Sequence, residues 1–101
     1  MLKLVAFIAL LLSTIIGDAQ KRTLIWGDEF NYKGLPDSTK WNYDVGGHGW
    51  GNNELQYYTS KQLKNARVEN GMLVIEAHKE KMNENDYTSA RLVTKGKGDW
   101  K

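Results

Sequence analysis

The residues best suited to chemistry lie in a glycine-rich stretch, residues 46–59, which continues into aromatic, amide and acidic side chains. Four of its first six residues are glycine, so the backbone can adopt positive φ and let another surface come close. Aromatic rings stack on the C–H face of a sugar, and amides and carboxylates bind its hydroxyl groups. The stretch therefore suits carbohydrate contact. The alternative is a turn whose aromatic side chains only fill a core.

Four tryptophans are many for a chain of 101 residues, and two of them have unusual neighbours. Trp26 and Trp41 stand in extended, apolar surroundings and are expected in the core. Trp50 and Trp100 stand among glycines and lysines. Each of these two is either a core residue or an exposed platform for a ligand.

Arg91 is the most distinctive charged residue. It belongs to an expected strand over residues 87–94, in which Ala90 and Leu92 fall on one face and Tyr87, Ser89 and Arg91 on the other. A guanidinium on such a polar face is either a solvated charge or a planar fork that binds hydroxyl or carboxylate groups in a groove.

Several other chemistries are excluded by residue type or spacing. Asp28 and Glu29 are adjacent, and consecutive strand residues point to opposite faces, so they cannot bracket one bond. The chain has two histidines and no cysteine, which argues against a zinc site. No nucleophile elbow, phosphate loop or dinucleotide fingerprint is present.

The elements that would position these residues are all extended. Asn70-Gly71 between two β-type runs predicts a type I′ hairpin over residues 66–77, with Leu73, Ile75 and Ala77 on one face. Further strands are expected at residues 23–30, 40–45, 54–58 and 87–94, with an exposed, charged loop at 80–86. In the run 54–58, Leu55 and Tyr57 are expected on the buried face and Glu54, Gln56 and Tyr58 on the wetter one. No sustained helical period occurs after residue 19, so the predicted class is all-β, a sandwich.

The N-terminus predicts export. Residues 1–19 combine a positive start, an apolar run from residue 4 to 16 and a small-residue site ending at Ala19, as in a secretory signal peptide. A signal anchor is the alternative. Cleavage leaves one domain, residues 20–101, that is secreted to the extracellular space or periplasm. Its net charge of +2 is too weak to predict binding to nucleic acid or to a membrane surface after cleavage.

Four blocks of the sequence, in this order, resemble the N-terminal part of the laminarinase-like branch of glycoside hydrolase family sixteen, the secreted endo-β-1,3-glucanases. They are residues 26–30 (WGDEF), 51–59 (GNNELQYYT), 65–77 (NARVENGMLVIEA) and 87–96 (YTSARLVTKG). The resemblance covers residues 24–101. It implies a partial β-jelly-roll of the concanavalin A type, whose concave face binds a β-glucan, and a monomeric full-length parent.

The resemblance also assigns individual residues. The residue matching Asn53 lines the glycone side of the family's cleft, and the residue matching Arg91 projects into it; Trp50 and Trp100 are added as substrate-binding candidates. Many members hold a structural calcium through main-chain oxygens at positions like Glu29 and Gly71, completed by an aspartate near the C-terminus. Calcium prefers such oxygen ligands. No cofactor is expected for catalysis.

The family's catalytic strand has the pattern Glu-x-Asp-x-x-Glu, which supplies the two carboxyls of a retaining mechanism. That pattern is expected beyond Lys101, so no catalytic residue is assigned here. Residues 84–86 match the start of this pattern, but Ser89 occupies the position of the last Glu and the segment is predicted to be a loop. These residues are therefore not taken as the catalytic motif. The hypothesis is a fragment of a β-1,3-glucan hydrolase, inactive alone. The alternatives are a glucan-binding, lectin-like module and a structural β-domain.

Overall fold

The structure is a computed structural model and describes residues 21–98. These residues contain six short strands: β1 (Asn42–Asp44), β2 (Gln56–Tyr58), β3 (Ala66–Glu69), β4 (Met72–Ile75), β5 (Tyr87–Ser89) and β6 (Arg91–Val93). The predicted all-β class is confirmed for this part of the chain. The expected signal peptide, residues 1–19, and Trp100 lie outside the described residues. Within residues 21–98, no helix has the length and apolar character needed to cross a membrane.

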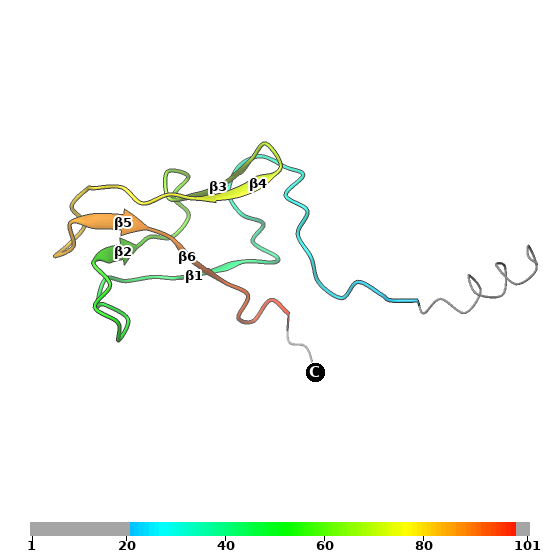
Figure 1. The fold of residues 1–101 in the computed structure, drawn as a ribbon, viewed down its shortest axis with the longest axis horizontal. Coiled ribbons are helices and arrows are strands. Elements are labelled where there is room, and N and C mark those ends of the chain that lie inside the picture. The colour runs from blue at the N-terminus through cyan, green and yellow to red at the C-terminus, as the bar shows by residue number, and fades with distance from the viewer. Residues whose placement is uncertain (1–20, 99–101) are drawn as a thin grey trace, which may run out of the picture.

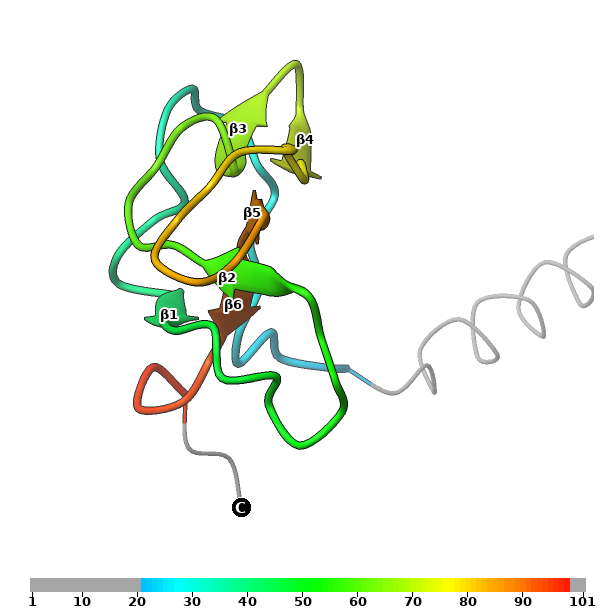
Figure 2. The same cartoon turned by 90° about the vertical axis from the view of Figure 1, so that its left-hand side faces the viewer.

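The strands form three separate pairs (Figure 1). β1 pairs with β6 and β3 with β4, both antiparallel, whereas β2 and β5 run parallel. Figure 2 shows the pairs one after another in the order β3 and β4, β5 and β2, β6 and β1. Apart from β3 and β4, strands that follow one another in the sequence belong to different pairs. Residues far apart in the sequence therefore become neighbours.

The predicted hairpin is confirmed. β3 and β4 pair in register from Ala66 with Ile75 to Glu69 with Met72. The two turn residues both have positive φ, 52° at Asn70 and 75° at Gly71, as a type I′ turn requires. The Asn-Gly dipeptide therefore fixed both the turn and the pairing of its flanking strands.

The expected strand over residues 87–94 is divided. Ala90, which is buried, separates β5 from β6. β5 joins β2, and β6 joins β1, so this one stretch links two pairs. The alternation of apolar and polar residues predicted one continuous strand. Such alternation indicates which face of a strand is buried, but it does not indicate which other strand pairs with it.

The expected strand at residues 23–30 is absent from the described residues. Leu24 and Ile25 are 78% and 81% exposed. A β-type composition produces a strand only where another strand is available to pair with it. Trp26 and Phe30 pack against the ring of Trp41, but no strand of the described residues pairs with this segment. In β2 the faces also differ from the expectation: Leu55, before the strand, is exposed, while Tyr58 is buried.

The best-buried side chains form a polar network. Asn65 and Thr88 have no exposed surface. Asn65 Oδ1 accepts a hydrogen bond from Thr59 Oγ1 at 2.7 Å, and its Nδ2 donates to the Glu76 carbonyl and to Thr88 Oγ1, both at 3.1 Å. The network ties together the ends of β2, β3, β4 and β5. We call it the Asn65 network.

Candidate functional site

The glycine-rich loop folds back on itself before β2. Gly46 and Tyr58 exchange two backbone hydrogen bonds, of 3.1 and 2.9 Å, which close the loop at its base. At its tip, the Gly49 carbonyl accepts from the amides of Asn52 and Glu54. Trp50 and Asn53 adopt positive φ of 52° and 54°, which is uncommon for residues other than glycine. The loop is thus compact, and it fixes the direction of both side chains.

Trp50 lies over this loop and against β2. Its indole N–H donates to the Gly46 carbonyl at 3.2 Å. Its ring lies 4.4 Å from the His48 ring and 6.0 Å from the Tyr58 ring, between centroids. The tryptophan therefore packs among aromatic side chains and is half-buried.

Arg91, from β6, covers the ring of Trp50. Its Cζ lies 4.6 Å from the ring centroid, within the range of a cation–π interaction. Its Nε lies 3.3 Å from Asp44 Oδ2, because β6 pairs with β1 and places Arg91 opposite Asp44. The side chain remains 41% exposed, so a ligand can still reach it.

Glu54 connects the loop to this arginine. Its Oε1 lies 3.9 Å from Arg91 Nη1 and accepts a short hydrogen bond from the Tyr58 hydroxyl. Its Oε2 accepts from Asn52 Nδ2 at 3.3 Å. The hydrogen bonds from Tyr58 and Asn52, aided by the charge of Arg91, lower the pKa of Glu54. Burial and the bond to Glu54 raise the pKa of Tyr58, which therefore stays a neutral donor.

The side chains of Trp50, Glu54, Tyr58, Arg91 and Asp44 form one connected set, which we call the Arg91 cluster. It presents an aromatic ring, a cation and two carboxylates within one partly exposed surface. Such a set binds hydroxyl-rich ligands by stacking and by charge-assisted hydrogen bonds. The amide of Asn53, on the same loop, is exposed and has no hydrogen-bond partner within residues 21–98.

Most of the similar known proteins are β-glucanases or laminarinases, although no family model matches the chain. The β-glucanase of Rhodothermus marinus is 55% identical over 102 residues, which cover 91% of this chain and 36% of that protein. The solved laminarinase from R. marinus superposes with a TM-score of 0.74 at 64% identity, covering 76% of this chain and 31% of that one.

A second solved structure is that of SCLam, a non-specific endo-β-1,3(4)-glucanase from family GH16, bound to an oligosaccharide. It gives a TM-score of 0.73 at 46% identity, over 81% of this chain and 35% of that one. The chain is therefore similar over most of its length to laminarinases and β-glucanases, the group of enzymes that includes SCLam of family GH16. It spans about a third of the length of these relatives, and its strands are part of their β-jelly-roll.

Within this laminarinase-like fold, the structure brings together two of the residues predicted to bind substrate. Trp50 and Arg91 are in contact, and Asn53 is on the same loop as Trp50. Trp100 lies outside the described residues. The contact between Arg91 and Trp50 was not part of the prediction, because it depends on which strand pairs with β1.

The sequence interpretation missed Asp44 as a site residue. Asp44 ends β1 and is paired with Arg91 only through the antiparallel register of β1 and β6. The one signal available was opposite charge on two predicted strands, and that is common on surfaces. The loop predicted over residues 80–86 contains a tight turn at residues 83 and 84, closed by two backbone hydrogen bonds of 2.9 Å that Met82 and Asn85 exchange.

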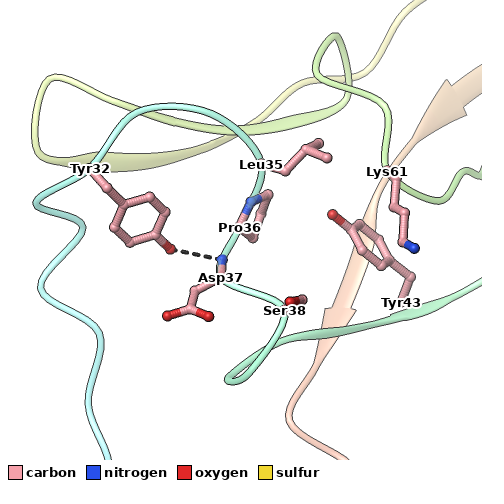
Figure 3. Close-up of a pocket in the computed structure, with 7 residues that line it drawn as sticks. All are labelled: Tyr32, Leu35, Pro36, Asp37, Ser38, Tyr43 and Lys61. Atoms are coloured by element: carbon pink, nitrogen blue, oxygen red, sulfur yellow. Dashed lines mark hydrogen bonds between the residues drawn. The ribbon is translucent and has the colours of Figure 1, made fainter.

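Two of the cavities in the described part of the laminarinase-like fold bear on the site. The smaller, about 230 Å³, is lined by Glu54 of the Arg91 cluster with Leu55 and residues 84–87. The larger, about 510 Å³, lies elsewhere, between Tyr32, residues 35–38, Tyr43 and Lys61 (Figure 3). Of these two, the smaller adjoins the Arg91 cluster, through Glu54.

The calcium prediction concerns two turns. Glu29 precedes Phe30, whose φ is 52°, and Gly71 ends the β3–β4 turn; both residues are exposed. The pairing of Gly34 with Val68 holds the segment after Glu29 beside β3. Residues 21–98 contain no group of three or more acidic, histidine or cysteine side chains that could hold a metal. Since calcium takes about six to eight oxygens, the two carbonyls need further ligands, and the site stays a prediction.

Proposed function

We propose that this chain is part of a secreted glycosidase that cleaves β-1,3-glucan, and that it supplies one wall of the glucan-binding cleft. The observation that carries the proposal is the Arg91 cluster beside the exposed Asn53 amide, in a chain 55% identical to a β-glucanase. A mutant of SCLam was crystallised with 1,3-β-D-cellotriosyl-glucose, a glucose oligosaccharide that contains a β-1,3 bond, and β-glucans with such bonds are the class of ligand we propose.

The proposed chemistry is retaining hydrolysis. One carboxylate attacks the anomeric carbon while a second, about 5 to 5.5 Å away, protonates the leaving oxygen. We assign neither group to this chain and expect both in a part of the protein outside these 101 residues. The role of this chain is to bind and orient: Trp50 and Arg91 offer a ring and a cation, and Asn53 offers both an acceptor and donors.

The first test uses the chain without residues 1–19. We expect no release of reducing sugar from laminarin above a blank without protein. Hydrolysis by a clean preparation would refute the assignment of the carboxylates elsewhere. If the chain alone is a stable monomer that binds laminarin-derived oligosaccharides without cleaving them, the lectin-like module is favoured instead. Secretion is tested by sequencing the N-terminus of the exported protein, which should begin at Gln20.

The second test uses a chimera in which residues 20–101 replace the matching part of the R. marinus β-glucanase. Arg91→Ala and Asn53→Ala should each lower kcat/KM on laminarin by about tenfold to a hundredfold, since each removes hydrogen bonds to the substrate. The matched control is Arg67→Ala, because Arg67 is also held by two carboxylates, Glu69 at 3.0 Å and Glu76 at 2.8 Å. Unchanged turnover in Arg91→Ala would show that this arginine is only a surface charge.

A further inference from the structure

The larger cavity is built from three segments that are separate in sequence. Tyr32 and residues 35–38 form one wall, and Tyr43 of β1 and Lys61, which follows β2, form the other (Figure 3). None of these residues belongs to the Arg91 cluster. We call this cavity the Tyr43 pocket. Its volume of about 510 Å³ is large enough for several side chains.

Two tyrosines line the pocket, and they differ in their hydrogen bonds. The hydroxyl of Tyr32 donates to Asp28 Oδ2 at 2.8 Å and accepts from the Asp37 amide at 3.0 Å. The hydroxyl of Tyr43 is buried and has no partner within residues 21–98. In Figure 3 it points toward the side of the pocket formed by Leu35 and Pro36. A buried hydroxyl without a partner is unfavourable, which suggests that a missing group completes it.

The strand that carries Tyr43 has a free edge. Each of the six strands pairs with only one other strand. Single bridges cover part of the second edge of β2, β3 and β5, but within residues 21–98 no bridge covers that of β1. Large apolar side chains in the same three segments are also exposed: Leu35 by 38%, Val45 by 48% and Leu63 by 53%. Unpaired edges and apolar surface of this kind recruit further polypeptide.

We propose that the Tyr43 pocket is the seat of a polypeptide segment from the rest of a laminarinase fold, which lies along β1 and supplies a hydrogen-bonding group to the Tyr43 hydroxyl. The chain superposes on a solved laminarinase yet spans only 31% of it, so the remaining strands of such a fold must pack on surfaces that these residues leave open. The inference rests on the family relationship and not on the proposed catalytic activity.

The test mixes this chain with the part of the R. marinus β-glucanase outside the matching third, by co-refolding. We expect a one-to-one complex with a dissociation constant in the micromolar range or tighter, measured by calorimetry and sedimentation. Tyr43→Phe should weaken it about tenfold, because one buried hydrogen bond is lost. The matched control, Tyr57→Phe in β2 and outside the pocket, should change it less than about twofold.

The sign of the Tyr43→Phe effect gives a second measurement. In this chain alone the variant should unfold at the same temperature or higher, because an unpaired buried hydroxyl is removed. In the covalent chimera it should unfold at a lower temperature, because there the hydroxyl has gained its partner. This comparison does not require assembly from two pieces.

A blocking variant tests the pocket itself. Ser38→Trp places a large ring at its lining and should abolish the complex, whereas Lys33→Trp, exposed and outside the lining, should leave it intact. Three outcomes would overturn the proposal. The two pieces could form no complex, the only complex could contain two copies of this chain, or Tyr43→Phe could change the unfolding temperature equally in the chain and in the chimera. A complex that forms but does not cleave laminarin counts against the proposed function and leaves this inference standing.

Discussion

The hydrogen bonds around Asn65 are buried, or part-buried in the case of the one to the Glu76 carbonyl, and join four strands, whereas the contacts around Arg91 lie at the surface and join one loop to two strands. Both sets are polar, and both connect residues distant in sequence. In the Asn65 network every donor is saturated by another part of the chain. In the Arg91 cluster the cation is 41% exposed, and its contact with Glu54 is long, at 3.9 Å.

This difference separates groups that hold the fold from groups that remain available to a ligand. A buried polar network is strong when complete and costly when one member is removed, because the remaining partners have no access to water. A partly exposed ion pair contributes little, since water replaces the lost partner. Substitutions in the Asn65 network should therefore lower stability, whereas substitutions in the Arg91 cluster should mainly weaken ligand binding.

The largest effect is expected for Asn65→Leu. The substitution keeps the number and branching of the side-chain heavy atoms but leaves Thr59, the Glu76 carbonyl and Thr88 short of partners. We expect a loss of about 3 to 5 kcal/mol in the free energy of unfolding, measured by urea denaturation of the chimera. The control Asn52→Leu, in the exposed loop, should change it by less than about 0.5 kcal/mol. If Asn65→Leu and Asn52→Leu lower the free energy of unfolding equally, the burial of the Asn65 amide is not the reason for its contribution to stability.

A smaller effect is expected for Gly47→Ala. A Cβ at Gly47 would lie 2.1 Å from Asn85 Oδ1. Asn85 would have to move and give up its hydrogen bonds to the carbonyls of Gly47 and Leu55, at 3.0 and 3.1 Å. We expect a loss of about 2 kcal/mol in the same urea experiment.

Gly51→Ala separates steric from conformational effects in the same loop. A Cβ at Gly51 meets no atom within 4 Å, but φ there is 66°. The cost should be about 1 kcal/mol, from the left-handed backbone alone. If Gly51→Ala costs as much as Gly47→Ala, the contact with Asn85 is not what restricts Gly47.

Acid should weaken the buried network through Glu80. Its carboxylate lies 2.6 Å from Lys64 Nζ and accepts from Thr88 Oγ1 at 2.6 Å; these hydrogen bonds lower its pKa below the ordinary value of 4.5. A carboxyl whose pKa is lowered on folding stabilises the folded state above its unfolded pKa, and this stabilisation is lost as the pH falls through the folded pKa. The melting temperature should stay level down to about pH 5 and fall below it. In Glu80→Gln the fall should be smaller; an unchanged fall would exclude Glu80.

The smallest effect on stability is expected for Arg91→Ala, the variant expected to alter turnover strongly. Loss of the contact with Trp50 and the exposed pair with Asp44 should cost about 0.5 to 1 kcal/mol in urea denaturation. A loss above about 2 kcal/mol would place Arg91 with the structural residues and remove the distinction between the two regions.

Local features of this chain were predictable from its sequence. Asn70-Gly71 specified the hairpin, since few residue pairs accept two positive φ angles in succession. The alternation around Arg91 predicted a polar face on which Tyr87 and Arg91 are exposed, although Ser89 on that face is buried. The glycine loop before β2 was predicted with its aromatic side chains. The four family blocks predicted the laminarinase-like fold that the structural comparison shows.

The tertiary structure alone decided which segments meet. Only the pairing of β6 with β1 sets Asp44 beside Arg91, and only the parallel pairing of β2 with β5 carries Thr88 to Asn65. Composition predicted a strand at residues 23–30 that did not form, and gave no sign that an asparagine would be among the most buried side chains. Backbone preferences act within a few residues and can be read locally. Strand partners and burial depend on contacts between segments that are tens of residues apart in the sequence. These contacts stabilise the chain only after folding has brought the segments together.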